Sequence, residues 1–272
     1  LILGHVNNLN ESTLEIIKKK HKNIKLGQWF EDNLSKNGPD PITNKNNFFN
    51  YIDYLDHNFV TSDPVNLGLN KKYNCSYLPI PVDKNIESLR CYQNKNPIKD
   101  LFFTMSHGVN KGVLKKNKVD VREPFVKKLI SSNPDIIFDI YGYKNNQPIW
   151  SNDFYDALYK SKMALNLSRI NNVKYYSSNR IASLVGNGIL TFVDINTKFN
   201  DFFSNDEIVF YKNIKDLSNK LKYYKENDDK RIKIAKKGKE KYFKIFNNEI
   251  IADYICSRLF DRNVKKNIFW MK

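Results

Sequence analysis

The amino-acid sequence predicts an α/β fold built from two lobes. Short runs rich in β-branched and aromatic residues alternate with helical stretches along all 272 residues, as in parallel sheets flanked by helices. The alternation is interrupted at residues 78–83, where Pro79 and Pro81 exclude helix and favour an extended exit. A polar stretch follows up to Lys99, and the alternation then resumes. We therefore expect one domain over residues 1–95 and a second over residues 96–272.

The first domain opens on an apolar run that reads as a core strand. Its predicted strands are residues 1–4, 24–29, 58–61 and 75–80, and its predicted helices are residues 11–20 and 48–55. The chain begins at Leu1 without a methionine, and the run carries neither a basic segment before it nor a cleavage site after it. We expect that the start of this lobe lies outside the chain.

The second domain repeats the alternation and ends in helices. Its predicted strands are residues 101–105, 136–141, 163–167, 189–193 and 208–211, and its first predicted helices are residues 123–130, 154–161 and 178–185. From residue 214 onward the pattern is helical, ending in predicted helices at residues 229–246 and 250–259. In such a fold the ligand binds outside the carboxyl ends of the strands, and two facing lobes form a cleft. Functional residues are therefore expected in the loops that follow the strands.

The net charge of +16 makes a polyanion the first partner to consider. Of the 45 basic residues only 7 are arginine, and asparagine equals lysine at 38, so AT-rich codon usage explains much of the excess. No segment combines arginine and aromatic residues as nucleic-acid readers do, so we expect no nucleic-acid partner, with a basic nucleic-acid-binding protein kept as an alternative. No apolar run approaches the ~18 residues that a membrane span needs, so any membrane contact is expected to be peripheral.

The cysteines and histidines do not form a metal or disulfide pattern. Cys75, Cys91 and Cys256 are odd in number and have no metal-ligand spacing, which indicates reduced thiols in an intracellular, cytoplasmic protein. The four histidines lack ligand spacing, and no Asp-x-Asp occurs to hold a divalent ion on a diphosphate. The sequence therefore predicts no metal and no cofactor.

A loop with two glycines follows the predicted strand 101–105. Such a loop lets backbone amides approach a phosphate, although a plain turn fits it equally well. His107 suits either a neutral core position or a hydrogen bond to a phosphate or sugar. The candidate residues in this loop are Ser106, His107, Gly108 and Lys111.

The most specific stretch lies at residues 162–169 and 175–191, where a buried strand, a polar loop and a helix lead to two glycines. This stretch resembles the group 1 glycosyltransferases, in the branch similar to spore maturation proteins. That family carries an arginine eight residues before the glycine that precedes the next strand, and Arg180 stands eight residues before Gly188. The family usually has a ribose-binding glutamate five residues before that glycine, where this chain has Ser183.

The resemblance implies a GT-B fold of two Rossmann-like lobes, the first of them incomplete here. It also implies that Arg180 stabilises the departing diphosphate, and that Asp32 or Glu31 supplies a general base if the reaction inverts. The donor-binding residues expected from the glycine loop and from this resemblance together are Ser106, His107, Gly108, Lys111, Arg122, Tyr141, Gly142, Asn166, Ser168, Arg169, Tyr176, Ser177, Ser178, Asn179, Arg180 and Ser183.

Several of these residues also fit purely structural roles. Arg180 fits a helix surface, Ser177 and Ser178 fit an N-cap, and Tyr176 fits packing. The basic residues 230–242 fit a solvated helix face as well as contact with anionic lipid.

The sequence as a whole predicts a metal-independent glycosyltransferase of the cytoplasm, at most peripheral at the inner face of the membrane. Its expected reaction moves a sugar from a nucleotide-sugar donor to a hydroxyl of a glycan, lipid-linked or protein acceptor, such as a cell-envelope glycan. Ser183 favours the alternative of an inactive protein that binds a sugar nucleotide or glycan without turning it over.

Overall fold

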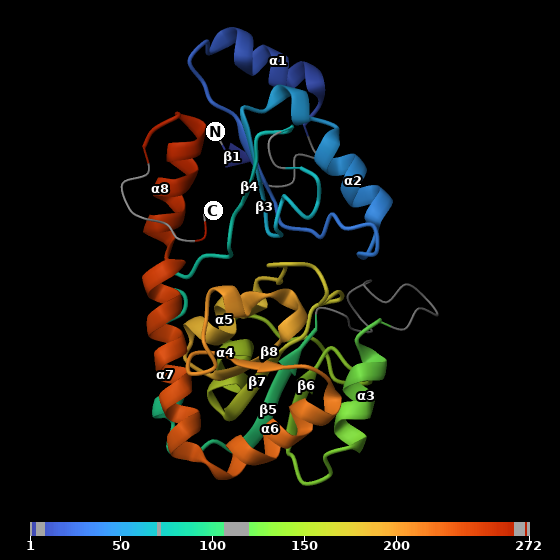
Figure 1. The fold of residues 1–272 in the computed structure, drawn as a ribbon, viewed down its shortest axis with the longest axis vertical. Helices are drawn as coiled ribbons and strands as arrows, with labels where there is room; N and C mark the ends of the chain where they lie inside the picture. The colour runs from blue at the N-terminus through green and yellow to red at the C-terminus, as the bar shows by residue number, and fades with distance from the viewer. Residues whose placement is uncertain (1, 4–8, 70–71, 106–119, 264–269, 271–272) are drawn as a thin grey trace. The chain divides into compact units, whose positions relative to one another are not determined.

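The computed structural model describes residues 2–3, 9–69, 72–105, 120–263 and 270, and its contacts divide the chain into two compact units (Figure 1). Unit 1 combines the residues up to Pro81 with Asn172–Ser178 and the residues from Ile245 onward. Unit 2 consists of Val82–Asn171 and Asn179–Lys244. These contact-based units have other bounds than the domains expected over residues 1–95 and 96–272: residues 82–95 are grouped with unit 2, and residues 172–178 and 245–272 with unit 1.

Unit 1 is built on a parallel sheet with the strand order β1-β2-β3-β4. Its strands are β1 (Ile2–Leu3), β2 (Gly27–Phe30), β3 (His57–Val60) and β4 (Cys75–Tyr77). Successive residues of β3 point to opposite faces. Val60 joins the apolar cluster that contains Phe48, while Phe59 packs edge-on against Tyr254. The sheet is therefore buried on both faces.

The helices of unit 1 match the sequence prediction in part. Helix α1 (Glu11–Lys20) has the predicted bounds, and its N-cap side chain, Asn10, accepts a hydrogen bond from the Thr13 N–H. The predicted helix at residues 48–55 is wrong: α2 is Pro41–Phe49, and Ile52–Tyr54 forms a short 3₁₀ turn. Pro41 suits the start of a helix because its missing N–H needs no partner there. Helix α8 (Asn248–Leu259) completes the unit.

Unit 2 is built on a parallel sheet with the strand order β6-β5-β7-β8-β9. Its strands are β5 (Lys99–Thr104), β6 (Phe138–Tyr141), β7 (Ser161–Asn166), β8 (Leu190–Asp194) and β9 (Val209–Tyr211). Within this sheet β5 comes first in the sequence, and β6 pairs with it on one side. The chain then crosses back, so that β7 pairs with β5 on the other side. The strand order therefore reverses between β5 and β7, and the crevice at the carboxyl ends of these two strands is where α/β sheets of this kind bind ligands.

Helices cover both faces of the second sheet (Figure 1). Leu101 and Phe103 of β5 pack in one cluster with side chains of α3 (Glu123–Ser131), α6 (Ile214–Glu226) and α7 (Asp228–Ile245). Phe102, between them, packs in the opposite cluster with α4 (Ser151–Tyr159) and α5 (Arg180–Gly186). Burial of side chains on both sides of one strand is typical of a parallel sheet covered on both faces. Among the described helices, none combines the length and the apolar composition that a membrane span requires.

Candidate functional site

Arg180 lies at the point where the strand order of the second sheet reverses. It is the first residue of α5. Its Nε donates to the carbonyl of Thr104, the last residue of β5, at 3.0 Å, and its Nη1 donates to the carbonyl of Leu167, just after β7, at 3.2 Å. The guanidinium carbon lies 5.3 Å from the centre of the Phe103 ring. These contacts hold the guanidinium between the carboxyl ends of β5 and β7, with backbone carbonyl oxygens accepting from two of its nitrogens.

Polar residues continue the same edge beyond β7. Asn166 ends the strand and Ser168 follows it, and both side chains are buried. The Ser168 N–H donates to Oδ1 of Asn171 at 3.0 Å, which closes a tight polar turn. Arg169 is exposed beside them. The predicted residues Asn166, Ser168, Arg169 and Arg180 therefore gather at one edge of the sheet.

Asp120 joins two of the candidate arginines. Nε and Nη2 of Arg122 each donate to a different oxygen of Asp120, both at 2.8 Å, and Nε of Arg169 lies 3.6 Å from Oδ2. Burial acts to raise the pKa of Asp120, but the hydrogen bonds and charge of Arg122, with the charge of Arg169, outweigh it and lower the pKa to about 2. Arg122, predicted to bind the donor, thus has its fork engaged with a carboxylate.

Tyr141 and Gly142 lie at the carboxyl end of β6. Gly142 has a φ of 70°, which few other residues adopt, and its N–H donates to the carbonyl of Asn146. Burial and the neighbouring Asp139 raise the pKa of Tyr141 to about 12. The ring of Tyr141 packs near Phe102, with centroids 6.1 Å apart. The hydroxyl of Tyr141 is therefore occupied by Asp139, and Gly142 provides the tight turn.

The segment before α5 differs from its prediction. The helix begins at Arg180 with Asn179 as its N-cap, so the prediction that Ser177 or Ser178 caps it is wrong. Asn179 makes no side-chain capping hydrogen bond. Ser177 is buried and its hydroxyl donates to the carbonyl of Ser178. The Tyr176 N–H donates to the carbonyl of Val173, within a turn of unit 1.

The far end of α5 is held by a lysine from α7. Nζ of Lys239 donates to the carbonyls of Glu87, Leu89 and Gly186 at 2.7, 2.9 and 2.5 Å. Ser183 lies half-buried in the middle of the helix, and its carbonyl accepts from the Asn187 side chain. Lys239 therefore anchors the short helix whose first residue is Arg180.

Glu31 and Asp32 lie at the carboxyl edge of the other sheet. They follow β2 directly, with Glu31 half-buried and Asp32 exposed. The Thr61 hydroxyl, which follows β3, donates to the Glu31 carbonyl at 2.8 Å. Both carboxylates are thus placed where a fold of this kind presents reactive groups. Within the described residues they belong to unit 1, whereas Arg180 belongs to unit 2.

Some predicted residues lie outside the described part of the chain, and some important ones were not predicted. Ser106, His107, Gly108 and Lys111 fall in the undescribed segment 106–119. Asp120 and Lys239 were missed, although Asp120 stands two residues before Arg122 in the sequence. Among the described residues, no group of three or more His, Cys, Asp or Glu side chains is arranged to hold a metal ion.

Comparisons with known proteins identify the family and the fold of this chain. The sequence of residues 122–257, half of the chain, matches the family described as glycosyl transferase-like. No curated protein matches the sequence. The fold is similar to that of TarM, with a TM-score of 0.66 and 13% identity over 95% of this chain and 54% of TarM. The chain thus spans about half the length of TarM.

Two further solved structures are similar in fold. HepE of Anabaena, solved with UDP, has a TM-score of 0.58 and 12% identity over 93% of this chain and 77% of that protein. An α-glucosyltransferase, solved with UDP and a DNA 13-mer, has a TM-score of 0.59 and 15% identity over 96% of this chain and 80% of that protein. The two parallel sheets with their covering helices are those of the GT-B fold with Rossmann-like units.

Proposed function

Because the chain belongs to the glycosyl transferase-like family, we propose that it takes a sugar from a nucleoside diphosphate donor and transfers it to a hydroxyl group. A uridine nucleotide is the first donor to test, since HepE and the α-glucosyltransferase were both solved with UDP. The acceptor in this proposal is a glycan, a lipid-linked molecule or a protein, with a cell-envelope glycan as the leading case. The spore-maturation-like branch of the family is part of the same proposal.

The position of Arg180 is the observation that carries this proposal. As the sugar departs, negative charge accumulates on the diphosphate. Arg180 lies at the strand-order reversal, and its carbonyl contacts to Thr104 and Leu167 hold the guanidinium there before any ligand arrives. A guanidinium matches phosphate oxygens with a planar fork. Arg180 therefore supplies oriented positive charge where the leaving group would develop its own.

Other residues of the edge have supporting roles in the proposal. Asn166 and Ser168 supply polar groups beside the half-buried Arg180, and the exposed Arg169 adds a second positive charge. If the reaction inverts the configuration at the sugar, the acceptor hydroxyl loses its proton to a base, for which Glu31 and Asp32 are the candidates in unit 1. In this scheme arginine and lysine neutralise the diphosphate in place of a divalent ion.

The location of the protein is a further part of the proposal. Cys75 and Cys91 are buried and Cys256 is exposed, and all three are unpaired, which suits the reducing cytoplasm. Peripheral contact with an anionic membrane is proposed for the exposed lysines of α7, and sedimentation with phosphatidylglycerol vesicles tests it.

Nucleotide titration tests the donor site. The chain is mixed with UDP, GDP, ADP or CMP, with and without EDTA, and its thermal stability is measured. A nucleotide at ~100 times its dissociation constant stabilises the fold by about 2.7 kcal/mol. The proposal requires such a shift with at least one nucleoside diphosphate, unchanged by EDTA. Absence of any shift contradicts the donor site, and a shift abolished by EDTA contradicts metal independence.

Ser183 favours a second candidate function, in which the protein binds a sugar nucleotide without transferring the sugar. Ser183 stands where the family usually has the ribose-binding glutamate, and a serine hydroxyl is too short to span the same distance. Release of free UDP from UDP-sugars, with and without acceptors, separates the candidates. Nucleotide binding without any release would favour the inactive protein, and Ser183→Glu would then be expected to increase donor affinity.

A further inference from the structure

A cluster of basic residues lies at the amino edge of the first sheet, away from the candidate residues described above. Residues 18–25 contain five lysines and one histidine and no acidic residue. The run covers the end of α1 and the segment that leads into β2. Asp56 directly precedes β3. Glu31 and Asp32, by contrast, follow their strand, so the basic cluster occupies the opposite edge of the same sheet.

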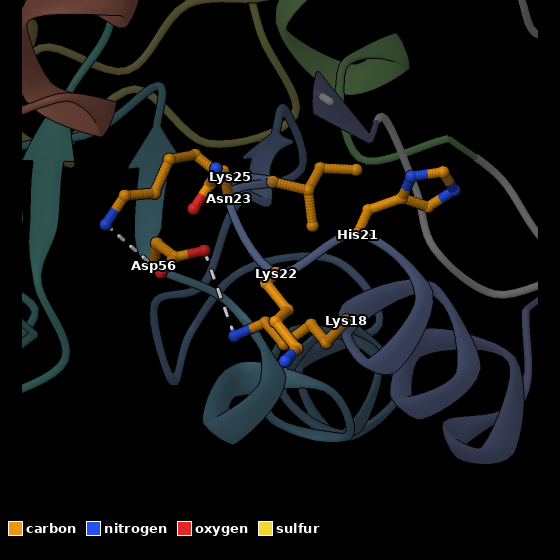
Figure 2. Close-up of a pocket in the computed structure, with 7 residues that line it drawn as sticks. Lys18, His21, Lys22, Asn23, Lys25 and Asp56 are labelled. Atoms are coloured by element: carbon orange, nitrogen blue, oxygen red, sulfur yellow. Dashed lines mark ion pairs between the residues drawn. The ribbon is translucent and has the colours of Figure 1, made fainter.

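These residues line a cavity of about 400 Å³ (Figure 2). Its volume lies within the range of small-ligand sites. The residues that line it are Lys18, His21, Lys22, Asn23, Ile24, Lys25 and Asp56. All of them belong to unit 1. The basic cluster therefore surrounds a hollow and does not form a flat surface.

Asp56 holds two of the lysines at the cavity. Its Oδ2 lies 3.8 Å from Nζ of Lys18, and its Oδ1 lies 3.7 Å from Nζ of Lys25. The Leu26 N–H donates to Oδ2 at 2.8 Å, which fixes the carboxylate. Ion pairs of this length on partly exposed side chains contribute little to stability. The carboxylate therefore orients the ammonium groups without binding them tightly.

The cavity keeps an excess of positive charge. Three lysines line it, and Asp56 is the only carboxylate among its lining residues. Within the described residues, no carboxylate lies within ion-pair distance of Lys22, which is exposed. The helix dipole explains basic residues in the last turn of α1, but Lys22 and Lys25 lie beyond that helix. The repulsion among these lysines is relieved when an anion enters.

The surroundings favour a discrete anion over a membrane surface. Glu11 and Glu15, exposed on α1, would repel an anionic bilayer. A phosphate group carries several anionic oxygens and can accept hydrogen bonds from more than one ammonium group, and each such hydrogen bond is charge-assisted. We propose that this cavity binds the phosphate group of a soluble phosphate ester. This site does not depend on the proposed sugar transfer.

The test uses three single variants of the whole chain. Lys22→Glu is expected to weaken binding of pyrophosphate at least about fivefold, because it removes the exposed charge of the cavity and inserts an opposite one. Asp56→Asn is expected to strengthen binding about threefold or more, because it removes the competing carboxylate and keeps an oxygen for the Leu26 N–H. Lys215→Glu, with the same charge change on an exposed position of α6, is the control and should alter binding less than about twofold.

Backbone amide NMR shifts of residues 22–25 report the binding at this cavity, so that occupation of the nucleotide site is not mistaken for it. Glycerol 3-phosphate and phosphatidylglycerol vesicles are tested in parallel with pyrophosphate. Saturable shifts with pyrophosphate and glycerol 3-phosphate support the proposal. Binding to vesicles alone, equal losses in Lys22→Glu and Lys215→Glu, or weaker binding in Asp56→Asn would each overturn it.

Discussion

Arg122 forms a bidentate ion pair with Asp120: Nε lies 2.8 Å from Oδ1 and Nη2 lies 2.8 Å from Oδ2. The backbone N–H of Arg122 also donates to Oδ1 at 2.9 Å, so the Asp120 carboxylate accepts hydrogen bonds from both the backbone and the side chain of Arg122. Both side chains are almost fully buried, at 6% and 3% exposure. This pair fixes the start of α3 and places Asp120 beside Arg169. Arg122 thus acts first as a structural residue of the edge.

Asp120→Asn is expected to destabilise the protein by about 3 kcal/mol, because it leaves a buried guanidinium without its counter-charge. Urea unfolding measures the loss. Asp216→Asn, which breaks a more exposed ion pair with Lys220 on α6, is the matched control and should cost less than about 1 kcal/mol. Equal losses in the two variants would contradict a special role for the Asp120 pair.

Gly238→Ala is expected to destabilise the protein by roughly 1–3 kcal/mol. Gly238 lies within α7, where alanine normally favours the helix by about 1 kcal/mol over glycine. An added Cβ would, however, collide with the backbone carbonyl oxygen of Glu207. Lys236→Ala on the exposed face of the same helix is the control and should be nearly neutral. A more stable Gly238→Ala variant would show that the close approach is absent.

His57 is expected to make the fold sensitive to mild acid. Burial, followed by the charge of Arg258, lowers the pKa of His57 from 6.5 to about 4. The unfolded chain therefore binds a proton between these two pH values while the folded chain does not, so stability falls as the pH drops from 6.5 towards 4. Unfolding measured across this range should show a shallower loss in His57→Gln. An identical pH profile for both proteins would rule out His57 as the source.

The three cysteines are expected to differ in reactivity. Burial raises the pKa of the Cys75 and Cys91 thiols to about 12, so neither forms the reactive thiolate at neutral pH, whereas Cys256 is exposed. A thiol reagent such as iodoacetamide should label Cys256 in the native protein and all three thiols after unfolding. Cys256→Ala should abolish native labelling and leave sugar transfer unchanged. Native labelling of Cys91 would contradict its burial.

The order of elements in the second unit could be predicted because short apolar runs, such as residues 163–165 and 209–211, alternate with stretches of helical spacing. Helix 123–130 and strand 163–167 were placed within one or two residues of α3 and β7. The α2 region was not placed correctly. The predicted helix began at Phe48, whereas the helix in the structure ends at Phe49. There the start signal at Pro41 was stronger than the apolar spacing.

The candidate site could be predicted in part. Asn166, Ser168 and Arg180 lie at or near the carboxyl ends of parallel strands. Because ligands of open α/β sheets bind at those ends, the predicted strands were enough to indicate these residues. The reversal between β5 and β7 depends on which strands pair, and no local pattern reveals that pairing. Hydrophobic periodicity predicts helices and strands but not individual side-chain contacts. It therefore could not reveal the ion pair that Arg122 forms with Asp120, or the hydrogen bonds by which Lys239 anchors α5.

Arg180→Ala is expected to lower sugar transfer about 10- to 150-fold, because charge-assisted hydrogen bonds to the diphosphate contribute roughly 1.5–3 kcal/mol. The loss should be larger in kcat than in donor affinity if the contact tightens as the leaving group departs. Arg180→Lys keeps the charge but loses the fork, so it should recover part of the activity.

The fold of the Arg180 variants needs its own measurement, because the residue also bonds to the Thr104 and Leu167 carbonyls. Thermal unfolding without ligand reports that structural contribution, and the nucleotide-induced stabilisation reports the donor site. Lys215→Ala, which removes a positive charge from an exposed position of α6, is the control and should leave both measurements nearly unchanged. A purely structural Arg180 would lower the unfolding temperature while the folded variant kept its donor affinity and turnover within about twofold of the original chain, and that result would refute the assignment. A donor-binding Arg180 would instead lose turnover at temperatures where the variant is fully folded, and lysine would restore the charge without restoring the full rate.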